Sequence, residues 1–219
     1  MRQTTRVGTS SSDRCLVLWS PDVGRATAHH LIRSIALPDF GIAGDGVRVV
    51  NHCRACGSTE HGRLALTGVP GDVTVHVSAS YCADVTVVAV TLVGPVGVDV
   101  ERADAMTSFV GFNDVVSHAV ENPGDHRSKA VTWVRKESLL KATGLGMSVD
   151  PRRVQVTESD QSPRLVAWEA DEPPGNPVWM DDVALSPGHV AAVTVLAAER
   201  PHLVVRRAAE AASAHPATR

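Results

Sequence analysis

Two acidic residues at alternate positions could hold a metal ion. The segment Gly97-Val98-Asp99-Val100-Glu101 alternates apolar and acidic side chains, which is the pattern of a strand with one face in a core. Asp99 and Glu101 would then project from the same face, where two carboxylates repel each other unless a cation lies between them. Paired oxygen ligands suit Mg²⁺, which also binds phosphates and waters. The alternative for so short a pattern is a solvated strand end.

A third carboxylate and a lysine share one stripe of a predicted helix. Trp133, Glu137 and Lys141 are spaced four residues apart, so they lie on one helical face. Glu137 could add a carboxylate to a metal site, and Lys141 could neutralise a phosphate. The alternative is an ordinary surface Glu–Lys pair, which contributes only a few tenths of a kcal/mol. Gly144-Leu145-Gly146 follows directly, ends the helix and lets the backbone approach a ligand.

Together, these two segments resemble the signature of a known family. Gly-Val-Asp-Val-Glu at 97–101 and Trp-x-x-Lys-Glu-x-x-x-Lys-x-x-Gly-x-Gly at 133–146 have the order and separation found in the 4′-phosphopantetheinyl transferase superfamily. The chain of 219 residues is about twice as long as a single-unit carrier-protein synthase. It therefore resembles the two-halved, Sfp-type branch of that family.

Shorter segments extend the resemblance from about Leu16 to Leu196. They are Leu31-Ile32-Arg33-Ser34, Cys56-Gly57 with His61-Gly62-Arg63, the stretch 75–80 that contains Ser78, the stretch 116–121 that ends in Glu121, and the strand 189–193. Ala79 replaces a family histidine that contacts the 3′-phosphate of coenzyme A, and the segment before the first helix is short. Loss of the histidine contact is expected to weaken coenzyme A binding by about 1–3 kcal/mol.

The resemblance implies an activity of the holo-[acyl-carrier-protein] synthase type. The 4′-phosphopantetheine arm of coenzyme A would be transferred to a serine of an apo acyl or peptidyl carrier protein, and 3′,5′-ADP would be released. Mg²⁺ is the implied cofactor and coenzyme A the implied substrate. Such carrier proteins serve polyketide, fatty-acid or nonribosomal peptide synthesis. The resemblance also implies a monomer, because the pocket of the two-halved enzymes lies between the halves of one chain.

A role for each matching residue also follows from the resemblance. Asp99, Glu101 and Glu137 match the Mg²⁺ ligands. Lys141 matches the lysine that contacts the α-phosphate and assists the departure of 3′,5′-ADP, while Glu137 or Glu121 would accept the proton of the carrier serine. The residues assigned to coenzyme A binding are Arg33, Gly62, Arg63, Ser78 and Lys141.

Bulk properties narrow the class of protein. The net charge of −3 gives no indication of a nucleic-acid or anionic-membrane partner. No apolar run approaches the roughly 20 residues of a membrane helix, and the polar N-terminus does not resemble a secretory signal, so we expect a cytoplasmic protein. In that compartment the four cysteines are expected to be thiols. Half of a zinc site at Cys53-x-x-Cys56 is the alternative.

The hydrophobic patterns predict an α+β fold. We expect two similar halves, each a small antiparallel sheet packed with helices, related by a pseudo-twofold axis. The predicted boundaries are a disordered N-terminus at 1–14, halves at 15–102 and 103–200, and a flexible tail at 201–219. Helices are predicted at 27–36 and 129–143, with a partly helical stretch at 107–121. Strands are predicted at 15–19, 73–77, 85–93, 96–100, 153–157, 164–168, 178–185 and 189–196, the third and fourth forming a hairpin around Gly94-Pro95.

Two other functions compete with an active transferase. A non-catalytic relative would bind coenzyme A or a carrier protein without turnover; Ala79 and the short N-terminal segment favour it, whereas the carboxylates and Lys141 argue against it. A Mg²⁺-dependent phosphohydrolase could use the same carboxylates. It would release phosphopantetheine to water without a carrier.

Overall fold

The computed structural model describes residues 13–53, 56–59 and 62–208. Most of the predicted disordered N-terminus, residues 1–12, therefore lies outside the described residues. Arg14 already belongs to the first strand, β1 (Arg14–Ser20). None of the helices in these three ranges is both long and apolar enough to cross a membrane.

Two mainly antiparallel sheets and their helices confirm the predicted α+β class. The larger sheet has the order β11-β1-β5-β4, with β4 at His76–Cys82, β5 at Val85–Thr91 and β11 at His202–Arg207. The smaller sheet has the order β6-β10-β9, from Val96–Arg102, His189–Leu196 and Val178–Asp182. Two hairpins complete the strands: β2 (Arg48–His52) with β3 (Arg63–Thr67), and β7 (Val154–Val156) with β8 (Leu165–Trp168).

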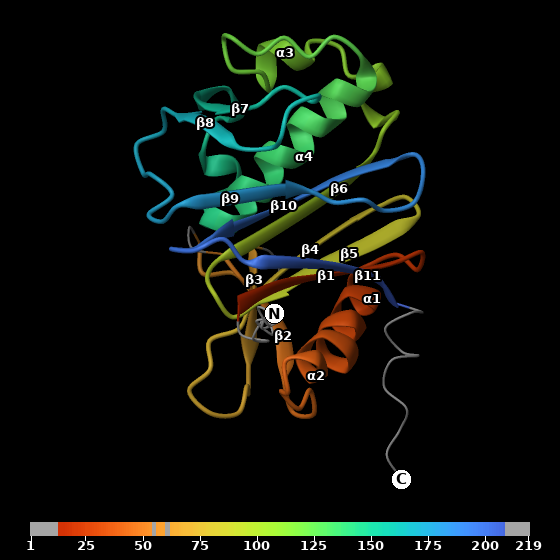
Figure 1. The fold of residues 1–219 in the computed structure, drawn as a ribbon, viewed down its shortest axis with the longest axis vertical. Helices are drawn as coiled ribbons and strands as arrows, with labels where there is room; N and C mark the ends of the chain where they lie inside the picture. Colours follow the sequence, from red (N-terminus) through yellow and green to blue (C-terminus); the bar gives the residue numbers. More distant parts are fainter. Residues whose placement is uncertain (1–12, 54–55, 60–61, 209–219) are drawn as a thin grey trace, which may run out of the picture.

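Helical segments cover the outer faces of the two sheets (Figure 1). On one side α1 (Arg25–His30), the π-helical η2 (Leu31–Ala36) and α2 (Leu37–Asp39) form one continuous segment. On the other side lies α4 (His126–Thr143). Short helical turns surround α4: η3 (Ala105–Ser108), α3 (Phe112–Val115), η4 (Gly146–Ser148) and η5 (Pro151–Arg153).

Alternation along the strands explains the layered core. Leu16 and Leu18 of β1 pack toward α1, η2 and α2, whereas Val17 between them packs against the second sheet. Val98 and Val100 of β6 belong to the same intersheet cluster as Val17. Strand β5 is buried at every position, because both faces of its sheet are covered. Strands covered in this way are apolar along most of their length.

Helix α4 is less amphipathic than its sequence predicts. It begins at His126, where Asp125 and Ser128 form a reciprocal capping box. Gly144 ends it in the left-handed conformation, as expected. Arg135 and Lys136 are fully buried inside it, because β10 and β6 cover one side of the helix and β7 another. Arg135 therefore binds Asp182 at 2.7 Å instead of facing solvent.

Three structural predictions were wrong. The strand predicted at 73–77 begins only at His76 and continues to Cys82. Strands β5 and β6 do not pair as a hairpin, since they belong to different sheets. Gly94 passes so close to the carbonyl oxygen of Leu196 that a side chain would meet it at 2.1 Å, and the chain crosses between sheets at this point. The predicted flexible tail also contains a strand, since β11 pairs in parallel with β1 along Arg14–Trp19.

Candidate active site

The predicted carboxylates come from two elements that pack directly on each other, β6 and α4. Gly97 makes the close approach possible, because a Cβ at this position would lie 2.0 Å from the Ser138 carbonyl oxygen and 2.5 Å from the Ala142 nitrogen. The glycine of the Gly-Val-Asp-Val-Glu motif is therefore required by packing. It brings the metal-type carboxylates of β6 beside the helix that carries Glu137 and Lys141.

Asp99 and Lys141 form the best defined contact of the site. The Nζ of Lys141 lies 2.6 Å from Asp99 Oδ1 and 3.3 Å from the Val98 carbonyl oxygen. The hydroxyl of Ser80 on β4 donates to the same Asp99 oxygen at 2.7 Å. The second oxygen, Oδ2, is buried and accepts no hydrogen bond from the described part of the chain. A buried carboxylate oxygen of this kind is suited to a cation.

Glu101 and Glu137 share the electrostatic environment of Asp99, and we call these three carboxylates the acidic cluster. Burial and then the negative charge of Asp99 raise the pKa of Glu137, while Lys141 partly offsets the effect. Burial and Asp99 likewise raise the pKa of Glu101. Burial and the charge of Asp99 thus raise the pKa of both glutamates, and a divalent cation would neutralise the negative charge that the three carboxylates gather here.

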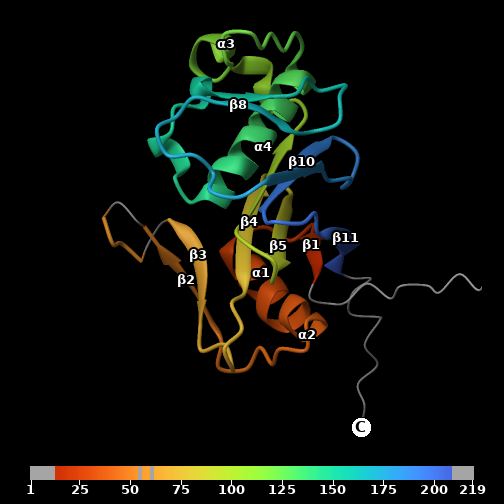
Figure 2. The ribbon, with the colours of Figure 1, turned by 60° about the vertical axis from the view of Figure 1, so that its left-hand side comes forward.

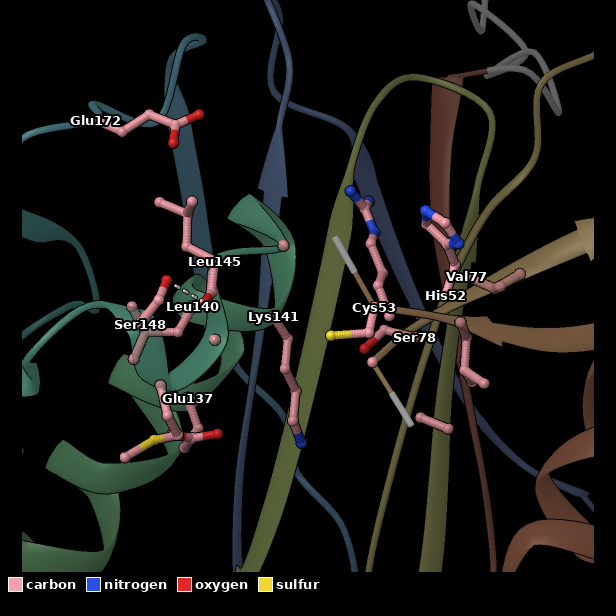
Figure 3. Close-up of a pocket in the computed structure, with 17 residues that line it drawn as sticks. His52, Cys53, Val77, Ser78, Glu137, Leu140, Lys141, Leu145, Ser148 and Glu172 are labelled. Carbon is pink, nitrogen blue, oxygen red and sulfur yellow. Dashed lines mark hydrogen bonds between the residues drawn. The ribbon is translucent and has the colours of Figure 1, made fainter. Parts of the chain in front are cut away.

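A pocket of about 700 Å³ opens beside the acidic cluster. One wall comes from the end of α4 and the following turn, with Glu137, Lys141 and the backbone of Gly144. The other wall comes from β3 and β4, with Arg63 and Ser78. Figure 3 shows Glu137 and Lys141 on the α4 side of the pocket and Ser78 on the opposite side. The pocket therefore lies between segments that are far apart in the sequence.

The predicted coenzyme A residues divide into those at the pocket and one elsewhere. Gly62, Arg63, Ser78 and Lys141 line it. Arg33 is exposed on η2, is not among the lining residues, and has its Nε 3.5 Å from the Gly44 carbonyl oxygen. Its role in binding coenzyme A stays a prediction.

Two of the lining residues have clear structural reasons for their positions. Gly62 has a φ of +101°, and a Cβ there would lie 2.4 Å from the His52 carbonyl oxygen, so the loop needs a glycine. The hydroxyl of Ser78 accepts a hydrogen bond from the Val98 nitrogen at 3.1 Å. This contact fixes the pocket wall to β6.

Glu121 lies in a separate buried network. One oxygen accepts from the His118 nitrogen at 2.7 Å and lies 2.6 Å from Lys136 Nζ, and the other accepts from the Val156 nitrogen at 2.7 Å. Burial lowers the pKa of Lys136, and its contact with Glu121 partly opposes this. Glu121 does not line the pocket. Its predicted role as proton acceptor stays a prediction beside the same prediction for Glu137.

Ser80 is a site residue that the sequence analysis missed. It lies two positions after Ser78 on β4, so both hydroxyls project from the same strand face. Ser78 binds the β6 backbone and Ser80 binds Asp99. The alternation of serines along 78–80 was the available signal. This signal could not be interpreted from the sequence, because it depends on the contact between β4 and β6.

A different trio has the tightest spacing of metal-type ligands. Within the described ranges, the ligand atoms of Cys82, Asp84 and His189 all lie within 4.8 Å of one another, and no other group of three meets this criterion. The carboxylates of the acidic cluster are thus more widely spread than this trio. Neither Cys53 nor Cys56, considered above as half of a zinc site, belongs to it.

Comparison with known proteins gives one family match. Residues 95–194, slightly less than half of the chain, match the family model of the 4′-phosphopantetheinyl transferase superfamily. The matched segment runs from the start of β6 almost to the end of β10 and contains the acidic cluster and Lys141. No curated protein has a significant match to the chain. The family match supports phosphopantetheine transfer as the general activity, with coenzyme A as substrate and a carrier protein as acceptor.

Proposed function

We propose that this protein is a Mg²⁺-dependent transferase of the two-halved, Sfp-type branch. It transfers 4′-phosphopantetheine from coenzyme A to a serine of an apo acyl or peptidyl carrier protein and releases 3′,5′-ADP. The observation that carries this proposal is that Glu137 and Lys141 line one wall of a 700 Å³ pocket, where Lys141 also binds Asp99 of the neighbouring strand β6. The segment that supplies these residues is also the segment that matches the family.

The donor set of the acidic cluster fits a magnesium ion. Asp99, Glu101 and Glu137 would hold it, since all three offer oxygen ligands. Asp99 Oδ2 is buried without a hydrogen-bond donor from the described part of the chain, and burial together with the charge of Asp99 raises the pKa of Glu101 and of Glu137. When bound, Mg²⁺ would offset the negative charge of the coenzyme A pyrophosphate during transfer.

In this proposal Lys141 is the cationic group that would contact the reacting phosphate. Asp99 Oδ1 and the Val98 carbonyl hold its ammonium group at the pocket wall. An ammonium group fixed in this way can donate to the α-phosphate and to the oxygen that leaves with 3′,5′-ADP. Because the lysine is positioned before the substrate binds, it stabilises developing negative charge without reorganisation.

Glu137 is the better of the two candidates for accepting the serine proton. It lines the pocket, where the serine of a carrier could reach its carboxylate. The oxygens of Glu121 are occupied by two backbone N–H groups and Lys136. We therefore assign the proton transfer to Glu137 and a positioning role to Glu121.

Arg63, Gly62 and Ser78 form the opposite side of the coenzyme A site in this proposal. Arg63 lines the pocket across from Lys141, and its planar guanidinium group can bind a phosphate through two hydrogen bonds. Gly62 lines the pocket in a loop that packs closely against the backbone of His52 and Cys53. Arg33 would contribute from η2, outside the pocket walls.

The transfer can be tested by intact mass spectrometry of the carrier. The pure protein is incubated with coenzyme A, Mg²⁺ and a panel of apo acyl and peptidyl carrier proteins. We expect one carrier to gain a single phosphopantetheine. Glu137→Gln should abolish the gain, and Glu199→Gln, which changes an exposed glutamate away from the pocket, should leave it unchanged. A folded protein that modifies none of the carriers contradicts the proposal.

A second candidate function is a non-catalytic relative that binds coenzyme A or a carrier. Ala79 favours it, because this residue lines the pocket with only a methyl group at the position of the family's histidine. Isothermal titration with coenzyme A separates the two candidates when it is combined with the mass measurement. Binding without any carrier modification supports the non-catalytic relative.

A further inference from the structure

Three side chains of metal-ligand type meet on the side of the molecule where the two sheets join. Cys82 is the last residue of β4, Asp84 lies in the two-residue turn before β5, and His189 is the first residue of β10. Their ligand atoms all lie within 4.8 Å of one another. The His189 Nε2 lies 2.8 Å from Asp84 Oδ1. The trio therefore draws residues from both sheets, separated by more than one hundred positions in the sequence.

The imidazole of His189 is oriented as a ligand would need to be. Its Nδ1 lies 2.9 Å from the hydroxyl of Ser186, which leaves Nε2 directed toward the trio. Histidines that bind metals usually have their second ring nitrogen fixed by such a partner. The His189 side chain is only 5% exposed, whereas the Asp84 side chain is 53% exposed. The trio is thus buried at His189, where the ring is held by Ser186, and open to solvent at Asp84.

The chemistry of the trio differs from that of the acidic cluster. One sulfur, one nitrogen and one oxygen ligand suit Zn²⁺, whereas Mg²⁺ takes oxygen ligands. An activated cysteine nucleophile is a poor alternative, because burial raises the pKa of the Cys82 thiol by more than the backbone hydrogen bond at Asp84 and the charge of Arg102 lower it. Reactive cysteines have lowered pKa values. A simple His189–Asp84 ion pair does not account for the position of Cys82.

We propose that Cys82, Asp84 and His189 form a Zn²⁺ site, separate from the acidic cluster, with water completing the coordination. The bound ion would join the β4–β5 turn to the start of β10. Because β4 and β10 belong to different sheets, the ion would crosslink the two layers of the fold. A ligand that binds only the folded state stabilises it, so the site would add to the stability of the protein.

Cobalt binding tests this proposal with the full chain. The metal-free protein is titrated with Co²⁺, whose thiolate complexes give a near-ultraviolet charge-transfer band. We expect this band at one Co²⁺ per chain, its loss in Cys82→Ser, and its displacement by Zn²⁺. Cys56→Ser, which changes an exposed cysteine outside the trio, should keep the band. Glu137→Gln should also keep it, because that residue belongs to the acidic cluster.

Thermal unfolding provides a second readout that does not depend on one variant. Zn²⁺ should raise the Tm of the unaltered protein and of Cys56→Ser, and should not raise the Tm of Cys82→Ser. If Cys82→Ser fails to fold, Asp84→Asn serves instead, since this side chain lies in an exposed turn; we expect Co²⁺ affinity to fall at least about tenfold. The proposal is overturned if no band forms, if the band survives Cys82→Ser, or if it depends on Cys56.

Discussion

Lys141 connects the acidic cluster to the pocket, so single-residue changes here test the chemistry. It binds Asp99 Oδ1 at 2.6 Å and lines the pocket wall. Lys141→Met should lower kcat/KM for carrier modification by at least about 100-fold, as expected for loss of a preorganised charge. Steady-state kinetics with a modified carrier would measure this. A variant within a few-fold of the unaltered protein would remove Lys141 from the mechanism.

Ser80 allows the positioning of Asp99 to be tested separately. Its hydroxyl donates to Asp99 Oδ1 at 2.7 Å. Ser80→Ala should cost about 1 kcal/mol of unfolding free energy and raise the Mg²⁺ concentration needed for half-maximal activity. Urea unfolding and a Mg²⁺ titration measure the two effects. Ser148→Ala in the turn after α4 is the control, since this hydroxyl donates to the Leu145 carbonyl oxygen of the same turn.

The raised pKa values of Glu101 and Glu137 predict how stability depends on pH. Both lie above the ordinary value of 4.5 because of burial and the charge of Asp99. The folded state therefore holds these protons more tightly than the unfolded chain does. This contribution to stability is present below pH 4.5 and is lost as pH rises through the raised pKa values.

Glu137→Gln should consequently raise the Tm of the protein at pH 7 when divalent metal is removed by a chelator. The gain should disappear below pH 4.5, where Glu137 is protonated in both states. Differential scanning calorimetry across this pH range tests the prediction. An equal Tm difference at all pH values would show that packing, and not charge, is responsible.

At the scale of single residues, the sequence predicted which side chains carry the chemistry but not which residues surround them. Asp99, Glu137 and Lys141 were found because their spacing places them on one strand face and one helix face. Ser80 was missed, since its importance depends on β4 lying against β6. The burial of Arg135 and Lys136 could not be read from α4 either, because their partners come from the segments before and after the helix.

Among the elements, the contact between β6 and α4 decides whether the acidic cluster forms. Gly97→Ala would place a methyl group 2.0 Å from the Ser138 carbonyl oxygen, and the helix would have to move. We expect a loss of about 1–3 kcal/mol of unfolding free energy together with weaker Mg²⁺ dependence of activity. Gly124→Ala is the matched control, since a Cβ there meets nothing within 4 Å. Equal unfolding free energies for both variants would refute this account.

Most helix and strand positions followed from local patterns, although β4 lies at His76–Cys82 and not at 73–77; strand pairing did not follow from them. Helix α4 was predicted from 129 and begins at His126, because the Asp125–Ser128 capping box adds three residues. The hairpin of β5 and β6 was predicted from the local turn residues Gly94-Pro95. In the structure, β5 pairs with β1 and β4, and β6 pairs with β10. Pairing of this kind depends on the whole chain.

Across the whole molecule, the C-terminal strand β11 closes the larger sheet beside β1 (Figure 2). Asp39 at the end of α2 binds Arg14 of β1 at 2.7 Å and Arg206 of β11 at 2.6 Å. The three side chains are largely buried, so they connect a helix to the two ends of the described chain. The Ala-rich composition of the C-terminal segment predicted a flexible tail and did not indicate that Arg206 would bind Asp39.

Asp39→Asn should therefore destabilise the protein more than loss of a surface ion pair. We expect a cost of about 1–3 kcal/mol, below that of a fully buried pair because solvent reaches part of the site. Asp171→Asn, which removes an ion pair of a 94% exposed carboxylate, should change stability by less than about 0.5 kcal/mol. Urea unfolding compares the two variants, and similar losses would contradict the proposed role of Asp39.

The most direct test of the central claim is the ratio of 3′,5′-ADP released to carrier modified. The pure protein is given coenzyme A, Mg²⁺ and a carrier found to be modified, and both products are quantified in one reaction. The proposed mechanism predicts equal amounts of the two, with neither product formed when the carrier is omitted or the metal is chelated. Release of 3′,5′-ADP without a carrier would contradict it and identify a phosphohydrolase.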